Sequence, residues 1–258
     1  LEFFAGIGLL RYALERQGWT VKFADDIDHQ KKQMYEAHFG TKSNDFHEGD
    51  IHLIDPKTVP SATLAAASFP CTDLSLAGAR AGLNGKQSSA FWGFVRIIEG
   101  MHERRPPLVM IENVPGFLSS HCGQDFENAM LALNQLGYDV DAFMIDAVHF
   151  VPQSRKRLFV VGTLAGHFSN RNDLFSLLSS SEIRPHMLME YIAKHPAIKW
   201  RLRPLPSLPE SNRRLESIIE DVSDNSPLWW SRDRVLYLLS QMSVLHREKA
   251  RQMIRERK

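Results

Sequence analysis

Apolar positions in the first 164 residues alternate between two spacings. Short, nearly continuous apolar runs predict buried strands, at residues 1–4, 21–27, 63–69, 108–114, 139–148 and 157–163. Runs with apolar residues three and four positions apart predict the intervening helices, at residues 9–18, 30–40, 91–101 and 125–137. This alternation is typical of an α/β fold, in which helices cover both faces of a mostly parallel, twisted sheet.

The alternation ends near residue 165. A proline-rich connector at residues 203–211 leads to two expected helical runs, around 214–222 and 232–258. We therefore expect a main domain over residues 1–164 and a helical appendage over residues 165–258. The first part carries 15 Lys and Arg against 19 Asp and Glu, whereas the second carries 16 against 11. A basic appendage beside an acidic domain favours a polyanionic partner, although basic helices are often only solvated faces.

Composition and cysteine content bear on the class of protein and its cellular compartment. No run of about 18 apolar residues is present, so we expect no membrane span. The two cysteines, Cys71 and Cys122, form no disulfide framework, and no His/Cys cluster has zinc-ligand spacing, so we expect no metal. A reducing, cytoplasmic compartment fits best.

A glycine turn follows the first strand, in the sequence FFAGIG with Gly6 and Gly8. Such turns let a ligand approach the backbone at the carboxyl end of a strand, but they also occur as simple tight turns. A dinucleotide fingerprint would require a third glycine where Arg11 stands, which argues against a nicotinamide-dependent oxidoreductase. Asp26 and Asp50 follow the next strands and suit ribose hydroxyls and an adenine amino group. This set favours a nucleoside such as S-adenosylmethionine.

Reactive side chains end several other strands. Cys71 follows the 63–69 strand, Glu112 ends the 108–114 strand, and Arg155 and Arg157 flank the start of the last strand. Taken singly, the cysteine could be a buried hydrophobe and the arginines solvated. Together they can supply a thiolate nucleophile, an acid beside the attacked ring and a guanidinium that holds it.

These residues stand in short motifs: FFAGIG, GDI, FPC followed by LSLAG, ENV and PQSRKRLFVVG, in this order. In that order they resemble motifs I, III, IV, VI and VIII of the cytosine-C5 DNA methyltransferases, over residues 1–164. The resemblance implies a Rossmann-like S-adenosylmethionine-dependent methyltransferase fold, with the main domain as its catalytic and cofactor-binding part. The appendage would begin a target-recognition region and appears in this sequence only in part.

The resemblance also implies a role for each matched residue. Cys71 would add to C6 of cytosine, Glu112 would act at N3 and the amino group, and Asn113 would hold the loop. Arg155 would contact the base and Arg157 would help position Cys71. The S-adenosylmethionine site would be lined by Phe4, Ala5, Gly6, Ile7, Gly8, Asp26, Ile27, Asp50, Ile51 and Pro70. Ser75, in a lid over residues 74–90, and Gln153 would contact DNA.

The implied substrate is duplex DNA, from which the target cytosine must be extruded. A restriction–modification role and a nucleoid-associated, bacterial-type location follow from the same resemblance. Thr72 and Leu9 depart from the family pattern without removing a reacting group, whereas the last two family motifs are not found before Lys258. A further segment, a second polypeptide that carries target recognition, or a degenerate copy would each account for this. Transfer RNA as substrate and a non-catalytic module remain the alternatives.

Overall fold

The structure is a computed structural model that describes residues 1–40, 45–70, 90–166, 180–211, 214–223 and 225–256. The chain divides into two compact units, Leu1–Asn212 and Arg213–Lys258. No helix within the described ranges is both long and apolar enough to cross a lipid bilayer.

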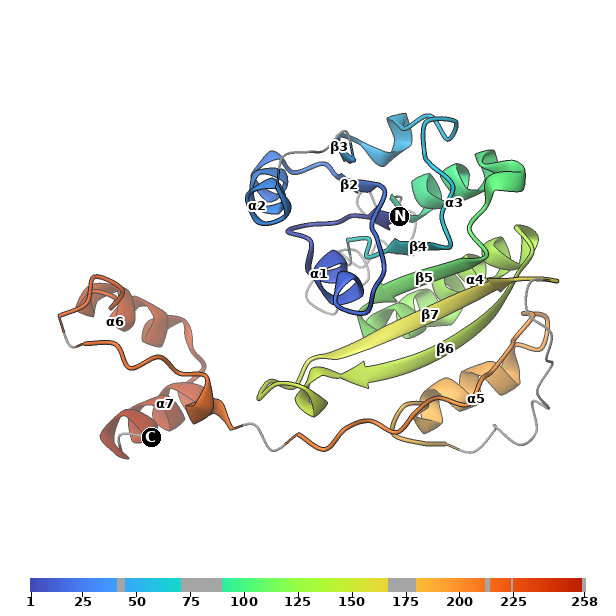
Figure 1. Ribbon diagram of the computed structural model, residues 1–258. Coiled ribbons are helices and arrows are strands. Elements are labelled where there is room, and N and C mark those ends of the chain that lie inside the picture. The colour runs from blue at the N-terminus through green and yellow to red at the C-terminus, as the bar shows by residue number, and fades with distance from the viewer. Residues whose placement is uncertain (41–44, 71–89, 167–179, 212–213, 224, 257–258) are drawn as a thin grey trace. The chain divides into compact units, whose positions relative to one another are not determined.

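The described strands of the first unit form one sheet (Figure 1). They are β1 (Glu2–Phe3), β2 (Ala24–Asp26), β3 (Phe46–Glu48), β4 (Leu64–Ala67), β5 (Leu108–Asn113), β6 (Tyr138–Asp146) and β7 (Lys156–Leu164). Their spatial order is β3-β2-β1-β4-β5-β7-β6, and all neighbours are parallel except β7, which runs antiparallel to β5 and β6. The expected α/β fold with a mostly parallel sheet is confirmed. The sequence pattern missed β3 because only Phe46 of this edge strand is buried.

Helices cover both faces of the sheet, with α1 in front of it and α4 behind it in the view of Figure 1. The first unit contains α1 (Leu9–Glu15), α2 (His29–Phe39), α3 (Ala90–Gly100), α4 (Gln124–Gln135) and α5 (His186–Lys194). Short 3₁₀ turns also connect elements, at η1 (Ile51–Leu53), η3 (His102–Arg104), η4 (Pro115–Gly123) and η5 (Ala147–His149).

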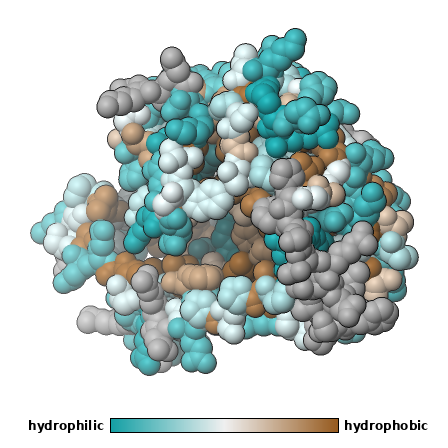
Figure 2. All heavy atoms as spheres, turned by 45° about the vertical axis from the view of Figure 1, so that its right-hand side comes forward, coloured by the Kyte–Doolittle hydropathy of each residue, from teal (hydrophilic) through white to brown (hydrophobic). Residues whose placement is uncertain are grey.

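The main core lies between the sheet and the helices α3, α4 and α5. Phe91, Phe94, Ile97 and Ile98 of α3 are fully buried, which accounts for the helical spacing of these residues. Phe94 packs edge-to-face on Phe3 of β1 with ring centroids 5.4 Å apart. Burial of one such side chain contributes about 1.5–3 kcal/mol. On the face drawn in Figure 2, hydrophilic residues predominate and hydrophobic ones lie between them.

A second, smaller hydrophobic cluster packs against the glycine turn. Tyr35 and Phe39 of α2 pack with Phe46 of β3, and the Tyr35 ring lies 4.8 Å from each of the other two rings. Gly8 approaches this cluster so closely that an added Cβ would lie 2.8 Å from Cδ2 of Tyr35. Its φ of 84° is also in the left-handed region, so both space and backbone conformation require glycine here.

The first unit extends well past the boundary expected at residue 164. Tyr191 of α5 packs on Phe126 of α4, and Val140 of β6 exchanges backbone hydrogen bonds with Lys199 and Arg201. The sequence pattern placed this region in the appendage because α5 follows no apolar strand. The structure instead divides the chain after Asn212.

The second unit contains the turn η7 (Leu215–Ser217) and the helices α6 (Arg232–Gln241) and α7 (Val244–Glu256). The helix expected around residues 214–222 was wrong, since helical structure there is limited to η7. The run expected over 232–258 is broken where Met242 adopts an extended conformation, with ψ of 147°. Arg247 donates to the carbonyl oxygens of Ser240 and Met242 at 3.0 and 2.9 Å, which satisfies the end of α6.

One buried ion pair ties the 180–211 region to the sheet and can be tested. Arg184 donates to both oxygens of Asp141 at 2.8 and 2.7 Å, and both side chains are less than a tenth exposed. Arg184→Ala should lower the free energy of unfolding by about 3–5 kcal/mol, because the carboxylate is left buried and unpaired. Chemical denaturation measures this change.

The exposed pair Lys194–Glu190, at 2.6 Å on α5, supplies the matched control. Lys194→Ala should cost about 0.5 kcal/mol or less. Equal losses in the two variants would contradict a structural role for the buried pair.

Candidate active site

The glycine turn is clamped to the end of β2. Ala5 donates its N–H to the carbonyl oxygen of Asp25 at 2.7 Å, and Gly6 donates to Oδ2 of Asp26 at 2.8 Å. Phe4 and Gly6 have φ of 59° and 57°, so the chain reverses direction sharply after β1. The expected cofactor residues Gly6 and Asp26 are therefore in direct contact, and Ala5 is held beside them by Asp25.

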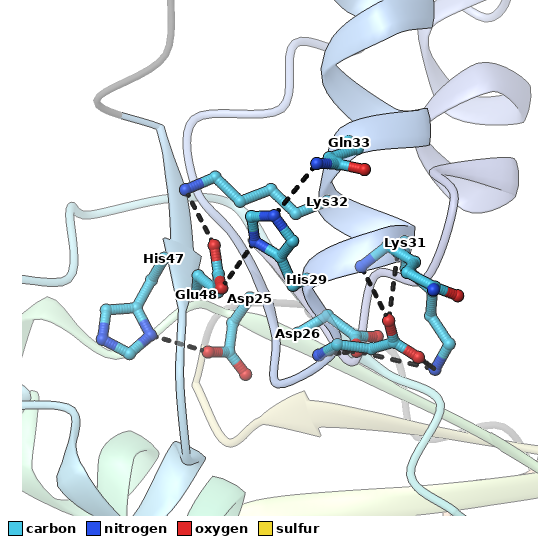
Figure 3. A network of polar contacts seen from close by, with 10 residues as sticks. Asp25, Asp26, His29, Lys31, Lys32, Gln33, His47 and Glu48 are labelled. Carbon is cyan, nitrogen blue, oxygen red and sulfur yellow. Dashed lines mark hydrogen bonds and ion pairs between the residues drawn. The ribbon is translucent and has the colours of Figure 1, made fainter.

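Asp26 lies at the junction of three segments. Its Oδ1 accepts from the N–H of Asp28 at 3.0 Å, and Lys31 Nζ lies 3.5 Å from the same atom (Figure 3). The carbonyl oxygen of Asp26 accepts from Gly49 at 3.2 Å, directly before Asp50. The acid expected after the second strand thus holds both the glycine turn and the segment that carries the second expected acid.

Asp50 and Ile51 have different surroundings. Asp50 caps η1 by accepting from the N–H of His52 at 2.9 Å, whereas Ile51 is buried at 4% exposure. Arg96 of α3 fixes this turn by donating to the carbonyl oxygens of Ile51 and Ile54. By contrast, the expected apolar contacts Ile7 and Ile27 are 44% and 70% exposed, which leaves them free to meet a ligand ring.

Two buried acids near the turn were missed by the sequence analysis. Glu2 is 2% exposed and accepts from the Arg11 N–H at 3.1 Å and the Tyr35 hydroxyl at 3.3 Å. Burial raises the pKa of Glu2 to about 7, against the effect of these hydrogen bonds. In the sequence, Glu2 could have been recognised as an acid within an apolar strand, and the second acid, Asp25, as one of two adjacent acids at the end of such a strand.

The second such acid, Asp25, pairs with a histidine of β3. His47 Nδ1 lies 2.9 Å from Oδ1 of Asp25, which is 1% exposed (Figure 3). Burial raises the pKa of Asp25 to about 6, His47 opposes this shift, and the negative charges of Asp26 and Asp50 add to it. The imidazole also packs on Gly49, where an added Cβ would lie 2.9 Å from Cε1 of His47.

The expected reactive acid and one expected arginine form an ion pair. Glu112 Oε1 lies 2.8 Å from Nε of Arg157, and these side chains are 28% and 18% exposed. The antiparallel register causes this contact, because Asn113 at the end of β5 pairs with Leu158 near the start of β7. The pair therefore stands at the same sheet edge as the glycine turn.

Asn113 is buried at 3% exposure and braces the chain before Cys71. Its Nδ2 donates to the carbonyl oxygen of Phe69 at 3.3 Å, and its Oδ1 accepts from the Val114 N–H at 2.8 Å. The exposed Pro70 follows Phe69 directly. Cys71 and Ser75 themselves lie outside the described residues.

Gln153 and Arg155 belong to the turn between β6 and β7. Asp146 holds this turn by accepting from the N–H groups of Val148 and Arg155 and from the Ser154 hydroxyl, at 3.1, 2.7 and 2.8 Å. Desolvation opposes ionisation of Asp146, but these hydrogen bonds outweigh it and lower its pKa. The side chains of Gln153 and Arg155 are exposed.

Comparison with known proteins decides the family. The family of C-5 cytosine-specific DNA methylases matches residues 1–248. This chain belongs to that family.

Relatives of this chain include type II methyltransferases. The type II methyltransferase M.HhaI of Haemophilus parahaemolyticus is 32% identical over 162 residues, which is 62% of this chain and 47% of that protein. M.MspI of Moraxella sp is 34% identical over 166 residues, which is 64% of this chain and 38% of that protein. The chain thus spans about half the length of these relatives, or less.

Solved structures support the methylase fold. A Spodoptera frugiperda DNMT2 mutant aligns with a TM-score of 0.58 at 20% identity, over 87% of this chain and 60% of that one. Dnmt2 of S. pombe aligns with a TM-score of 0.53 at 23% identity, over 72% of this chain and 56% of that one. Within the residues that the structure describes, no cluster of three or more His, Cys, Asp or Glu side chains could hold a metal ion.

The buried Asp25 gives this protein a testable pH dependence of stability. Its native pKa of about 6 lies above the ordinary value of 3.8, so the native state holds this proton more tightly between those values. The parent should therefore lose stability as pH rises through that window. Asp25→Asn keeps an acceptor for His47 but removes the titration. Relative to the parent, it should gain up to about 3 kcal/mol in unfolding free energy between pH 4 and pH 7.

Chemical denaturation across this pH range checks the difference between Asp25→Asn and the parent. Asp45→Asn, at an exposed carboxyl just before β3, serves as control and should leave the pH dependence unchanged. A difference that does not vary with pH would show that Asp25 stays ionised throughout.

Proposed function

We propose that this chain is the catalytic and cofactor-binding part of a DNA cytosine-C5 methyltransferase of the restriction–modification type. The observation that carries the proposal is the Glu112–Arg157 pair at 2.8 Å. It stands beside Asn113, whose amide fixes the residue before Pro70 and Cys71. An acid, a guanidinium and the start of the Pro-Cys segment therefore share one sheet edge, as the proposed chemistry requires.

The residues at the glycine turn fit S-adenosylmethionine. Asp26 uses two acceptor sites for the N–H groups of Gly6 and Asp28, and a carboxylate offers about four, so ribose hydroxyls can still be accepted. The exposed Ile7 and Ile27 offer apolar contact to an adenine ring. When bound, S-adenosylmethionine supplies a methyl group as an electrophile on a sulfonium sulfur, and the activated C5 of cytosine accepts it.

The proposed mechanism assigns the remaining work to four side chains. The Cys71 thiolate forms a bond to C6 of the extruded cytosine, which places an electron pair at C5. Glu112 hydrogen-bonds N3 and the amino group and so stabilises the charge that develops on the ring. Arg155 contacts the base, while Arg157 fixes the direction of Glu112. After methylation, a water molecule accepts the C5 proton, the electron pair of that bond forms the C5–C6 double bond, and the C6–S bond breaks to return the Cys71 thiolate.

Replacement of the proposed nucleophile tests the covalent step. Cys71→Ser should abolish the covalent complex with DNA that contains 5-fluorocytosine, because a hydroxyl is a far weaker nucleophile than a thiolate. Denaturing gel electrophoresis detects the complex. S-adenosylhomocysteine should still raise the melting temperature of the variant. A complex that persists in Cys71→Ser would overturn the assignment.

Glu112 gives a second, independent test. Glu112→Gln should lower kcat for methylation of unmethylated plasmid DNA by about 10²–10⁴-fold, with little change in S-adenosylhomocysteine affinity. The exposed Glu190 of α5 provides the control, since Glu190→Gln should keep the parent's rate. Transfer of labelled methyl groups to transfer RNA, and none to DNA, would replace the proposed substrate.

We also propose that the unit beginning at Arg213 opens the target-recognition region. Its α7 has no buried residue and exposes Lys249, Arg251 and Arg255, as suits contact with phosphates. Recognition of the full DNA site would then need further protein, from the same gene or from a second polypeptide. A location in the bacterial cytoplasm, on the nucleoid, belongs to the same proposal.

A further inference from the structure

The turn between β6 and β7 exposes apolar side chains to solvent. Val148, Phe150 and Val151 are 43%, 47% and 38% exposed, although they lie within four successive residues of one short turn. Single exposed apolar residues need no explanation, but a group of them in one place marks a contact surface.

This turn is rigid, so its exposed side chains are held in place. Phe150 and Val151 both donate their N–H to the carbonyl oxygen of Ala147 at 2.9 Å, and Asp146 accepts from three further groups of the turn. The ring of His149 is fixed between Glu182 and the Pro209 carbonyl, at 3.0 and 3.3 Å. A surface that is ordered before it meets its partner loses little conformational entropy on binding.

The turn projects from the edge that carries Glu112. The last residue of β5, Asn113, pairs with Leu158, whereas the β6–β7 ladder continues to the pair of Asp146 with Lys156. At about 3.4 Å per residue, the hairpin extends roughly 7 Å beyond β5 before the turn begins. Figure 1 shows this end of β6 and β7 at the same side of the sheet as the ends of β4 and β5.

The charges beside the apolar group identify the partner. Arg155 in this turn and Lys156 at the start of β7 are both exposed, so a partner must offer apolar surface next to negative charge. DNA bases flanked by phosphates meet both conditions, and aromatic side chains stack on bases or wedge between them. We infer that Phe150, with Val148 and Val151, contacts DNA bases beside the extruded cytosine and thereby favours extrusion. This inference rests on the proposed function and adds a substrate-contacting surface to it.

The test separates base extrusion from general DNA binding. Bisulfite sequencing of plasmid DNA treated with the full-length protein and S-adenosylmethionine first locates the methylated sites. Two short duplexes are then made with one such site, one intact and one with an abasic position opposite the target cytosine. In the second duplex the cytosine is already unpaired, so extrusion needs less help.

With S-adenosylhomocysteine present, Phe150→Ala should bind the intact duplex about tenfold more weakly than the parent, as expected for loss of one aromatic–base contact. Its affinity for the abasic duplex should stay within about twofold, because the base that extrusion leaves unpaired, which Phe150 would contact, is absent from that duplex. Phe150→Trp should restore binding to the intact duplex, since it retains an aromatic face.

Trp19 is the matched control, because it is 39% exposed and precedes β2, at the amino ends of the parallel strands. Trp19→Ala should bind both duplexes as the parent does. Equal affinities of Phe150→Ala and the parent for the intact duplex would overturn the inference while leaving methylation intact, and would favour a protein partner for this turn. An equal loss on both duplexes would also overturn it. No methylation of plasmid DNA by the parent would overturn the proposed function itself, and this inference with it.

Discussion

The strand β7 lies between β5 and β6 and runs antiparallel to both, and this constraint brings Glu112 and Arg157 together at the carboxyl end of β5. In a wholly parallel sheet, the start of every strand lies at the opposite edge from the end of its neighbour. Because β7 runs the other way, its first residues meet the last residues of β5, and Arg157 reaches Glu112 at 2.8 Å. The reversal also places the β6–β7 turn, with Arg155 and Phe150, at this same edge. One change of strand direction thus assembles groups that are far apart in the sequence.

The support of the glycine turn depends on buried carboxyl groups. Glu2 and Asp25 lie almost completely out of solvent, and their raised pKa values show that burial disfavours their ionised forms. Each has a hydrogen-bonding partner that offsets part of this cost, Tyr35 for Glu2 and His47 for Asp25. These partners come from α2 and β3, so the small cluster around Tyr35 connects the polar support of the glycine turn to its apolar packing.

Polar and apolar residues around the glycine turn and the β6–β7 turn have different roles. The side chains of Asp26 and Asn113 form hydrogen bonds with neighbouring backbone groups and thereby order the segments that carry Gly6 and Pro70. Ile7, Ile27 and Phe150 instead remain exposed on segments whose backbone is held by those bonds or by Asp146. Buried polar residues hold the backbone, and the apolar residues on these segments remain exposed to solvent, where a partner can contact them.

Sequence alone determined the order of most strands and helices, because apolar spacing reports burial directly. It also singled out Gly6, Gly8, Glu112 and Arg157, since glycines in a turn and charged groups at the ends of apolar strands are local features. The edge strand β3 and the helix α5 were missed, because their burial comes from distant contacts such as Tyr35 with Phe46 and Tyr191 with Phe126. Only the tertiary structure decided that Arg157 rather than Arg155 pairs with Glu112, and that Asp25 pairs with His47. Those choices follow from strand direction and register, which no local spacing encodes.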